Sequence, residues 1–251
     1  MSNRFFVDSL ATEVAVLTGQ EAHHAASVLR LKVGSEVELF DGRGGSAAGR
    51  ITRIGRGEMF VAIADRRPPA VRIGPVVHLG FAAPKGKRLD WLLEKATELG
   101  AASLQPVIFE RSIAGRGQLS EAKLRRWLGH CVAAAKQSGL NFLPELRPPA
   151  SLAKYLAAAG GSLRLLGDPA GEAPLPAVLA GRAADQPIAL LIGPEGGLAP
   201  AERAAAIESG VQTVRIGQTV LRTETAAIAL LAAVMAFSGD ASRRAGPARG
   251  A

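Results

Sequence analysis

Buried strands and amphipathic helices alternate along the chain from about residue 75 to residue 237. The runs of strand type are VVHLGFA, SLQPVIF, SLRLLG, QPIALLIG and VQTVRIG. Segments with helical spacing of apolar residues separate several of them, as in GKRLDWLLEKATELG at residues 86–100, whose leucines share one face. This alternation predicts a parallel α/β sheet with helices on both faces.

Residues 1 to about 68 follow a different pattern, with short alternating runs divided by Gly-rich turns. EVELFDGRGG and EMFVAIADR predict strands, and EAHHAASVLRL predicts a short helical insert. The Pro-rich, basic stretch RRPPAVRIGP at 66–75 is typical of a linker. We therefore expect a small β-barrel or sandwich over residues 1–70, an α/β domain over 71–238 and a basic disordered tail over 239–251.

The charge balance favours a polyanionic partner. The net charge is +8, which most often indicates nucleic-acid binding, although a composition rich in Arg, Ala and Gly is the alternative explanation. The single cysteine, Cys131, excludes internal disulfides and fits a reducing cytosol. The four histidines and Cys131 lack the spacing of a zinc site. The N-terminus lacks a signal-peptide h-region, and the longest apolar run, 226–237, is too short for a bilayer. The sequence thus predicts a cytoplasmic protein with neither metal nor membrane contact.

The stretch LLIGPEGG at residues 190–197 is a buried strand that ends in a Gly-rich turn before a helix. Ligands of open α/β sheets bind at the carboxyl ends of strands. Gly193, Gly196 and Gly197 allow a ligand to approach the backbone, or allow the chain to turn with positive φ. A tight turn without a ligand is the alternative.

The stretch RIGQTVLR at residues 215–222 repeats this pattern. Two such loops could line one pocket, in which Val220 and Leu221 would suit an adenine and its ribose. The nearest approach to a dinucleotide-binding fingerprint, GRGGSA at 42–47, has no following helix and is interpreted as a hairpin turn.

Arg222 and Glu224 stand at the entry of a helix that is apolar on every side. In a structural interpretation, Thr223 or Thr225 caps this helix, Glu224 complements its dipole and Arg222 pairs with a carboxylate such as Glu195. In a functional interpretation, the charges face a cleft beside the ligand. Helix entries use these residue types routinely, so the sequence alone leaves both open.

Basic residues in both domains could follow a phosphate backbone. Arg4, Arg30 and Arg43 lie in the first domain, and Lys85, Lys87 and Arg88 open a helix of the second. A solvated basic face is the alternative. Lysine is unfavourable at a helix N-terminus, which favours a functional role for the KGKR group.

Two of these motifs resemble a known family. LLIGPEGGLAPAE followed by IGQTVLRTETAAIA is similar to the C-terminal signature of the RsmE family, 16S rRNA uridine-N3 methyltransferases of the SPOUT superfamily. The resemblance extends over nearly the whole chain. Further matching segments occur in the family's order: RFF at 4–6, HHAASVLRLKVGSEVELFDG at 23–42, KGKRLDWLLEKATELGA at 85–101, ERS at 110–112 and PEL at 144–146.

The resemblance implies an N-terminal PUA-like RNA-binding barrel and a C-terminal SPOUT domain with a trefoil knot. It also implies bound S-adenosylmethionine, a homodimer, and 16S rRNA or the small ribosomal subunit as partner. The cofactor-binding residues carried over by position are Leu166, Gly167, Ile192, Gly193, Gly196, Gly197, Ile216, Gly217, Val220, Leu221 and Thr223. The expected RNA-binding residues are Arg4, Arg30, Lys85, Lys87, Arg88 and Arg111.

The chain departs from the family pattern in AAKQSGLNFLPEL. Lys136 stands where the family has an acid, and Leu140 stands where it has an arginine. If that arginine holds RNA in the family, another residue must do so here, and Arg111, Arg116 and Arg147 are the candidates.

The expected reaction is methyl transfer to N3 of a uridine. This nitrogen carries a proton at neutral pH, so a base or a cation that stabilises the uracil anion is needed. Glu195 or Glu224 could take the proton, and Arg222 could stabilise the anion. The alternatives are ribose 2′-O or guanine N1 methylation, or a non-catalytic rRNA-binding assembly factor. A DNA-binding regulator is disfavoured because no recognition-helix motif is present.

Overall fold

The computed structural model describes residues 3–112 and 119–244, with side chains up to Phe237. The chain forms two compact units. The first comprises the residues up to Arg72 together with Val132–Leu143, and the second comprises Ile73–Cys131 and the chain from Pro144 onward. The division at Arg72 lies close to the boundary expected after residue 70. The inclusion of Val132–Leu143 in the first unit is not expected from the sequence.

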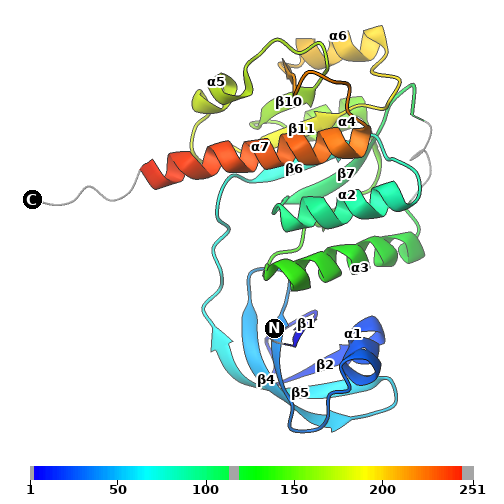
Figure 1. The fold of residues 1–251 in the computed structure, drawn as a ribbon, viewed down its shortest axis with the longest axis vertical. Helices are drawn as coiled ribbons and strands as arrows, with labels where there is room; N and C mark the ends of the chain where they lie inside the picture. The colour runs from blue at the N-terminus through cyan, green and yellow to red at the C-terminus, as the bar shows by residue number, and fades with distance from the viewer. Residues whose placement is uncertain (1–2, 113–118, 245–251) are drawn as a thin grey trace, which may run out of the picture. The chain divides into compact units, whose positions relative to one another are not determined.

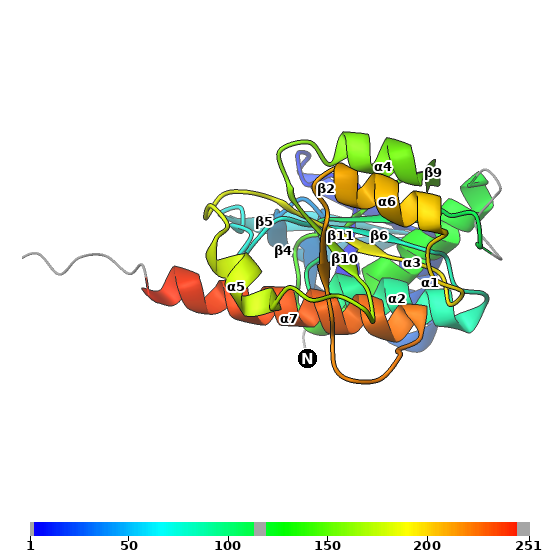
Figure 2. The ribbon, with the colours of Figure 1, turned by 90° about the horizontal axis from the view of Figure 1, so that it is seen from above.

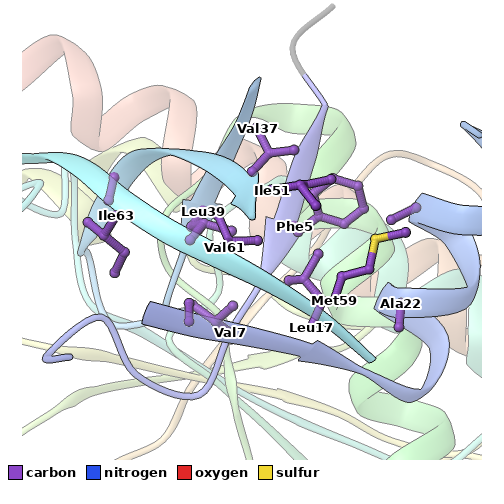
Figure 3. Packing of buried hydrophobic residues seen from close by; sticks show 13 residues of the cluster. Phe5, Val7, Leu17, Ala22, Val37, Leu39, Ile51, Met59, Val61 and Ile63 are labelled. Atoms are coloured by element: carbon purple, nitrogen blue, oxygen red, sulfur yellow. The ribbon is translucent and has the colours of Figure 1, made fainter. Parts of the chain in front are cut away.

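The first unit is built on a five-stranded sheet with the order β1-β3-β4-β5-β2. Its strands are β1 (Arg4–Phe6), β2 (Val14–Thr18), β3 (Glu36–Phe40), β4 (Ser46–Ile54) and β5 (Glu58–Arg67). The β4–β5 pairing has register shifts at Ala48/Gly49 and Ile51/Arg53, and such bulges bend a sheet. The curled sheet encloses an apolar core that includes Phe5, Leu39 and Val61 (Figure 3).

The helical insert of the first unit changes from an α-helix to a π-helix along its length. Helix α1 (Gly19–His23) continues directly into a π-helical turn, His24–Val28. Arg30 follows with a φ of 52°, a left-handed conformation that non-glycine residues seldom adopt. The predicted helix is therefore present, and it ends in an uncommon turn with exposed Val28 and Arg30.

The GRGG segment forms the predicted hairpin turn between β3 and β4. Asp41 accepts hydrogen bonds at Oδ1 from the backbone amides of Arg43 and Gly45, at 2.8 and 2.9 Å. Gly42 and Gly44 both have positive φ, which explains the glycines.

The second unit contains the predicted parallel sheet (Figure 1). Its order is β12-β10-β11-β6-β7-β8, and β9 pairs with β7. The strands are β6 (Val77–Phe81), β7 (Ser103–Ile108), β8 (Glu145–Leu146), β9 (Ala150–Ser151), β10 (Leu163–Gly167), β11 (Ile188–Ile192) and β12 (Gln212–Val214). All the recorded pairings of this sheet are parallel. The two-residue strands β8 and β9 lack a sequence signal of their own.

Helices cover both faces of this sheet, as predicted. Helices α4 and α6 lie on one face, and α2, α5 and α7 lie on the other (Figure 2). The helices are α2 (Lys87–Glu98), α3 (Glu121–Ser138), α4 (Leu152–Ala158), α5 (Leu175–Ala180), α6 (Pro200–Glu208) and α7 (Thr223–Arg244). Helix α7 continues to Arg244, into the segment expected to be a tail without structure, and residues 245–251 lie outside the described residues. Among the described residues, no helix combines the length and apolarity that crossing a bilayer requires.

Cys131 on α3 is fully buried, and burial raises the pKa of its thiol to about 11. Since the thiolate is the reactive form, we expect alkylation of the native protein to be at least ~1,000-fold slower than alkylation of the urea-unfolded chain. Mass spectrometry of iodoacetamide-treated protein measures both rates. Rapid native labelling would mean that α3 opens readily.

Candidate functional site

Three loops meet at the carboxyl ends of neighbouring parallel strands in the second unit. They follow β10, β11 and β12, which lie side by side because β10 pairs with both of the others. The loops enclose a hollow of about 250 Å³. This is the position at which open α/β sheets bind ligands.

Most of the predicted cofactor residues line this hollow. Those present are Leu166, Gly167, Ile192, Gly193, Gly197, Ile216, Val220, Leu221 and Thr223. Gly196 and Gly217 belong to the same loops without lining the hollow. The structure adds Asp168, Pro169, Pro194, Glu195, Leu198, Arg203, Thr219 and Ala226.

The lining combines apolar side chains with backbone. Val220 is 79% exposed beside Ile216 and Leu221, so an apolar surface is open to a ligand there. Gly197 has a φ of 68°, and a Cβ at this position would meet no protein atom within 4 Å. The glycine therefore permits the turn, while the space around it stays free. An apolar wall with nearby backbone groups suits a purine and its ribose.

Thr223 joins two of the loops. Its hydroxyl donates to the carbonyl oxygen of Gly193 at 3.2 Å, which ties the start of α7 to the loop after β11. The structural interpretation of the sequence expected a helix cap at this position. The hydroxyl instead fixes the spacing of two ligand-facing segments.

Asp168 and Arg203 form a polar corner of the hollow that the sequence analysis missed. The Arg203 Nε lies 3.0 Å from Oδ2 of Asp168, and the Ala170 amide donates to Oδ1 at 2.8 Å. Asp168 could have been found from the sequence, because it directly follows the strand SLRLLG and therefore stands at the carboxyl edge of the sheet. The carboxylate is thereby held at the rim of the hollow.

A second, smaller hollow of about 180 Å³ adjoins the first, since Pro194 and Glu195 line both. It lies where β6 and β11 end, beside the start of α2. Its remaining lining residues are Ala82, Ala83, Pro84, Lys85, Arg88 and Ser112. A molecule in this hollow would face a molecule in the first across the Pro194–Glu195 segment.

Arg88 lies between two carboxylates at this junction. Its Nη1 is 3.5 Å from Oε1 of Glu195 and 3.9 Å from Oε1 of Glu224. Glu224 is buried, and its Oε2 has no hydrogen-bond partner among the described residues. A buried carboxylate requires a counter-charge, which Arg88 supplies.

The surroundings of the Arg222 side chain differ from those that the sequence suggested. The structural interpretation gave Glu195 as an example of a partner for Arg222, but the cation that pairs with Glu195 is Arg88. Arg222 is exposed and lines neither hollow. Within residues 3–112 and 119–244, its side chain forms no recorded ion pair.

The predicted RNA-binding residues have different environments. Arg30 and Lys87 are exposed, whereas Lys85 and Arg88 line the second hollow. Arg111 donates from Nη1 to the carbonyl oxygen of Gly196 at 2.8 Å, so it supports the loop after β11.

Arg4 is buried rather than exposed, which revises the expectation of a phosphate contact. Its guanidinium donates to the carbonyl oxygen of Ala135 at 2.8 Å and to Asn141, and lies 3.5 Å from Glu38. Burial lowers the pKa of Arg4. These contacts hold β1 against the Val132–Leu143 segment within the first unit.

Replacing Arg4 with Met should destabilise the first unit by about 2–4 kcal/mol, because buried acceptors lose their donor. Hydrogen-exchange mass spectrometry should show faster exchange in peptides from β3 and β4. Arg50, paired with Glu36 at the surface, provides the control, and Arg50→Met should change stability by less than about 0.5 kcal/mol. Equal exchange in both variants would contradict a structural role for Arg4.

The residues that depart from the family pattern also lie in the first unit. The Lys136 ammonium contacts both carboxylate oxygens of Glu21 at 3.0 and 3.1 Å and lies over the ring of Phe5. A structural ion pair therefore accounts for Lys136. The Leu140 amide donates to Ala135, which closes α3. Of the candidate replacements for the family arginine, Arg147 pairs with Glu145, and Arg116 lies outside the described residues.

Among the residues that the structure describes, no three His, Cys, Asp or Glu side chains form a cluster suited to a metal ion.

Thr223→Val should weaken ligand binding in the first hollow about tenfold, because the isosteric change leaves the Gly193 carbonyl without its donor. Isothermal titration with S-adenosylmethionine, the cofactor that the family resemblance implies, measures this affinity. Thr52→Val is the matched control, since Thr52 bonds to Phe60 in the first unit. An unchanged affinity would show that the Thr223 hydrogen bond does not position the loops.

Comparison with known proteins defines the class. A family model described as an RNA methyltransferase domain matches residues 73–235, and one described as an RNA methyltransferase PUA domain matches residues 17–64. The two hollows thus lie in an RNA methyltransferase domain that is joined to a PUA domain.

Similarity to individual proteins identifies the family within this class. Ribosomal RNA small subunit methyltransferase E of Mycobacterium bovis is 36% identical over 240 residues, covering 92% of this chain and 90% of the relative. The crystal structure of the Neisseria gonorrhoeae protein of that name, bound to S-adenosyl methionine, is 28% identical, with a TM-score of 0.82 over 96% of this chain and 99% of the other. A putative methyltransferase from Legionella pneumophila with bound SAM is 30% identical, with a TM-score of 0.82 over 94% and 98%. The chain belongs to the ribosomal RNA small subunit methyltransferase E family.

Proposed function

We propose that this protein transfers a methyl group from S-adenosylmethionine to N3 of a specific uridine in 16S rRNA of the small ribosomal subunit. The observation that carries the proposal is the position of Glu195, which lines both adjoining hollows. A carboxylate at this junction is placed to act between a cofactor in one hollow and a base in the other. The names of the relatives support small-subunit rRNA as the substrate.

The first hollow fits the cofactor. Val220 and Leu221 would cover the adenine, and the glycine-containing loop after β11 brings backbone groups close. Asp168 and Arg203 offer polar groups at the rim. When bound, S-adenosylmethionine supplies an electrophilic methyl group on a sulfonium.

The protein must remove a proton and align the base. In the proposed reaction, the N3–H bond of uracil breaks and Glu195 accepts the proton. The N3 electron pair forms the new bond to the methyl carbon, and the electron pair of the broken C–S bond stays on sulfur. N3 lies on the Watson–Crick edge, so the uridine must be unpaired or flipped out of a helix. Holding N3 in line with the C–S bond would supply much of the acceleration.

We also propose that the protein has the trefoil knot, the homodimeric state and the cytoplasmic location that the family implies. Helix α7 carries apolar side chains that are only partly buried, including Ile228, Ala229 and Ala232. An apolar helix face of this kind is compatible with a subunit interface, and analytical ultracentrifugation would establish the oligomeric state.

The decisive experiment uses small subunits from a strain that lacks this modification, with methyl-labelled S-adenosylmethionine. After digestion of the rRNA, mass spectrometry identifies the labelled nucleoside. We expect 3-methyluridine. A 2′-O-methylated nucleoside or 1-methylguanosine would keep the fold and change the specificity. Cofactor binding without label would indicate a non-catalytic rRNA-binding factor.

A further inference from the structure

The second hollow has a lining unlike that of the first. Its apolar lining residues are Ala82, Ala83 and two buried prolines, Pro84 and Pro194. Its polar groups come from Lys85, Arg88, Ser112 and Glu195. A mixed lining of this kind, with alanine and proline beside charged side chains, suits a planar ring that carries polar groups along one edge.

The charges in this hollow include two cations and one carboxylate. Arg88 lies 3.5 Å from Glu195 and 3.9 Å from the buried Glu224. The Lys85 ammonium is exposed, and among the described residues it forms no recorded ion pair. One cation is therefore held by the protein, while the other is available to a ligand.

This set of charges complements the Watson–Crick edge of uracil. That edge presents a carbonyl oxygen, the N3–H donor and a second carbonyl oxygen. Two cations can donate to the oxygens while one carboxylate accepts from N3–H. Cytosine presents an amino group and an N3 lone pair, which would face a cation and a carboxylate respectively. Each of these contacts would be repulsive or unpaired.

We infer that the second hollow, where β6 and β11 end, receives the target base, and that Lys85, Arg88 and Glu195 read its edge and select uracil over cytosine. The inference rests on the proposed function and assigns Lys85 and Arg88 to the base instead of the phosphate backbone. During the reaction, the N3 proton passes to Glu195. The negative charge left on the uracil oxygens is stabilised by Lys85 and Arg88.

The position of Glu224 explains how Arg88 keeps its place. When Glu195 becomes neutral on accepting the proton, Arg88 loses one of its two anionic partners. Glu224 remains as the buried anion beside it. The guanidinium therefore stays at the edge of the hollow at the stage when the base carries its charge, and Glu224 acts as a positioning residue.

The test compares uridine with 5-fluorouridine in reconstituted small subunits. Fluorine at C5 makes the N3 proton more acidic, so the base depends less on proton removal and on charge stabilisation. With uridine, we expect Lys85→Met to lower the rate about 100-fold and Glu195→Gln to lower it about 1,000-fold. With 5-fluorouridine, the loss of rate in each variant relative to wild type should be at least ~10-fold smaller, because the more acidic N3–H needs less help from a base or a cation.

Matched controls and a folding check accompany these variants. Lys154→Met and Glu208→Gln replace exposed residues of the same types on α4 and α6. Their rates should match wild type on both substrates. Lys85 is exposed, so its replacement does not disturb packing, and a thermal shift with S-adenosylmethionine reports that the first hollow is intact.

Two results would overturn the inference. In one, Lys85→Met and Glu195→Gln methylate at the rates of their controls. In the other, they lose equal activity on both substrates, which indicates a role unrelated to the charge of the base. The proposed function fails separately, if the wild-type protein produces no 3-methyluridine in the same subunits.

Discussion

Glu195→Gln is expected to lower the rate constant for methylation by about 10³-fold, with little change in the affinity for S-adenosylmethionine. The amide keeps the size and shape of the side chain, but it replaces one acceptor oxygen with an NH2 donor and cannot accept the N3 proton. Single-turnover kinetics with saturating cofactor would measure the chemical step, and titration calorimetry would measure binding. Because Glu195 lines both hollows, the variant separates proton transfer from cofactor binding.

Glu224→Gln provides the comparison, since the two carboxylates share Arg88. Glu224 lines neither hollow and is buried, so its replacement should cause a much smaller loss. The opposite order, with the larger loss at Glu224, would assign the base to Glu224 and make Glu195 the residue that positions Arg88. Equal losses in rate and in cofactor affinity for Glu195→Gln would exclude a role confined to proton transfer.

Two of the three loops of the first hollow, those after β11 and β12, could be predicted because their signals are local, whereas Leu166 and Gly167 came from the family resemblance. A buried strand that runs into Gly-rich sequence identifies a carboxyl end, and glycine beside apolar residues indicates space for a ligand. Val220 illustrates this point, since a large apolar side chain in a polar loop needs a partner. These signals required no knowledge of which strands are neighbours.

The second hollow could not be predicted because it depends on strand order. Arg88 and Glu195 are 107 residues apart, and they meet because β6 pairs with β11. Neither helical nor strand periodicity specifies that pairing. The sequence therefore identified Glu195 and Arg88 separately and assigned them to different functions. It named Glu195 only as an example of a carboxylate that could pair with Arg222.

The burial of charged residues could not be predicted from the neighbouring sequence either. Arg4 resembles a surface cation because it stands near the N-terminus in a short strand. Its acceptors lie at Ala135 and Asn141, more than half of the chain away. The same long-range packing brings Lys136 to Glu21, across a separation of 115 residues. The departure of Lys136 from the family pattern is thus accounted for by an ion pair within the first unit.

Gly80→Ala should destabilise the second unit by about 3 kcal/mol, because the site has no room for a methyl group. A Cβ at Gly80 would lie 2.5 Å from Cζ and 2.6 Å from Cε2 of Tyr155. The ring cannot move away easily, since the buried Tyr155 hydroxyl donates to the carbonyl oxygen of Leu190 at 2.7 Å and lies 3.2 Å from that of His78. The hydroxyl thus bridges β6 and β11, the two strands that carry the second hollow. Urea unfolding followed by tryptophan fluorescence would measure the loss.

The same substitution should also lower activity, since a shift of β6 against β11 moves Lys85 and Glu195 apart. Gly181→Ala is the matched control, because its added Cβ meets only ordinary contacts at 3.7 Å and the backbone φ is −80°. Replacing Tyr155 with Leu in the Gly80→Ala background should restore part of the stability, because removal of the ring makes room for the methyl. If Gly80→Ala is as stable as its control, then Tyr155 does not constrain the pairing of β6 and β11, and the geometry of the second hollow must depend on other contacts.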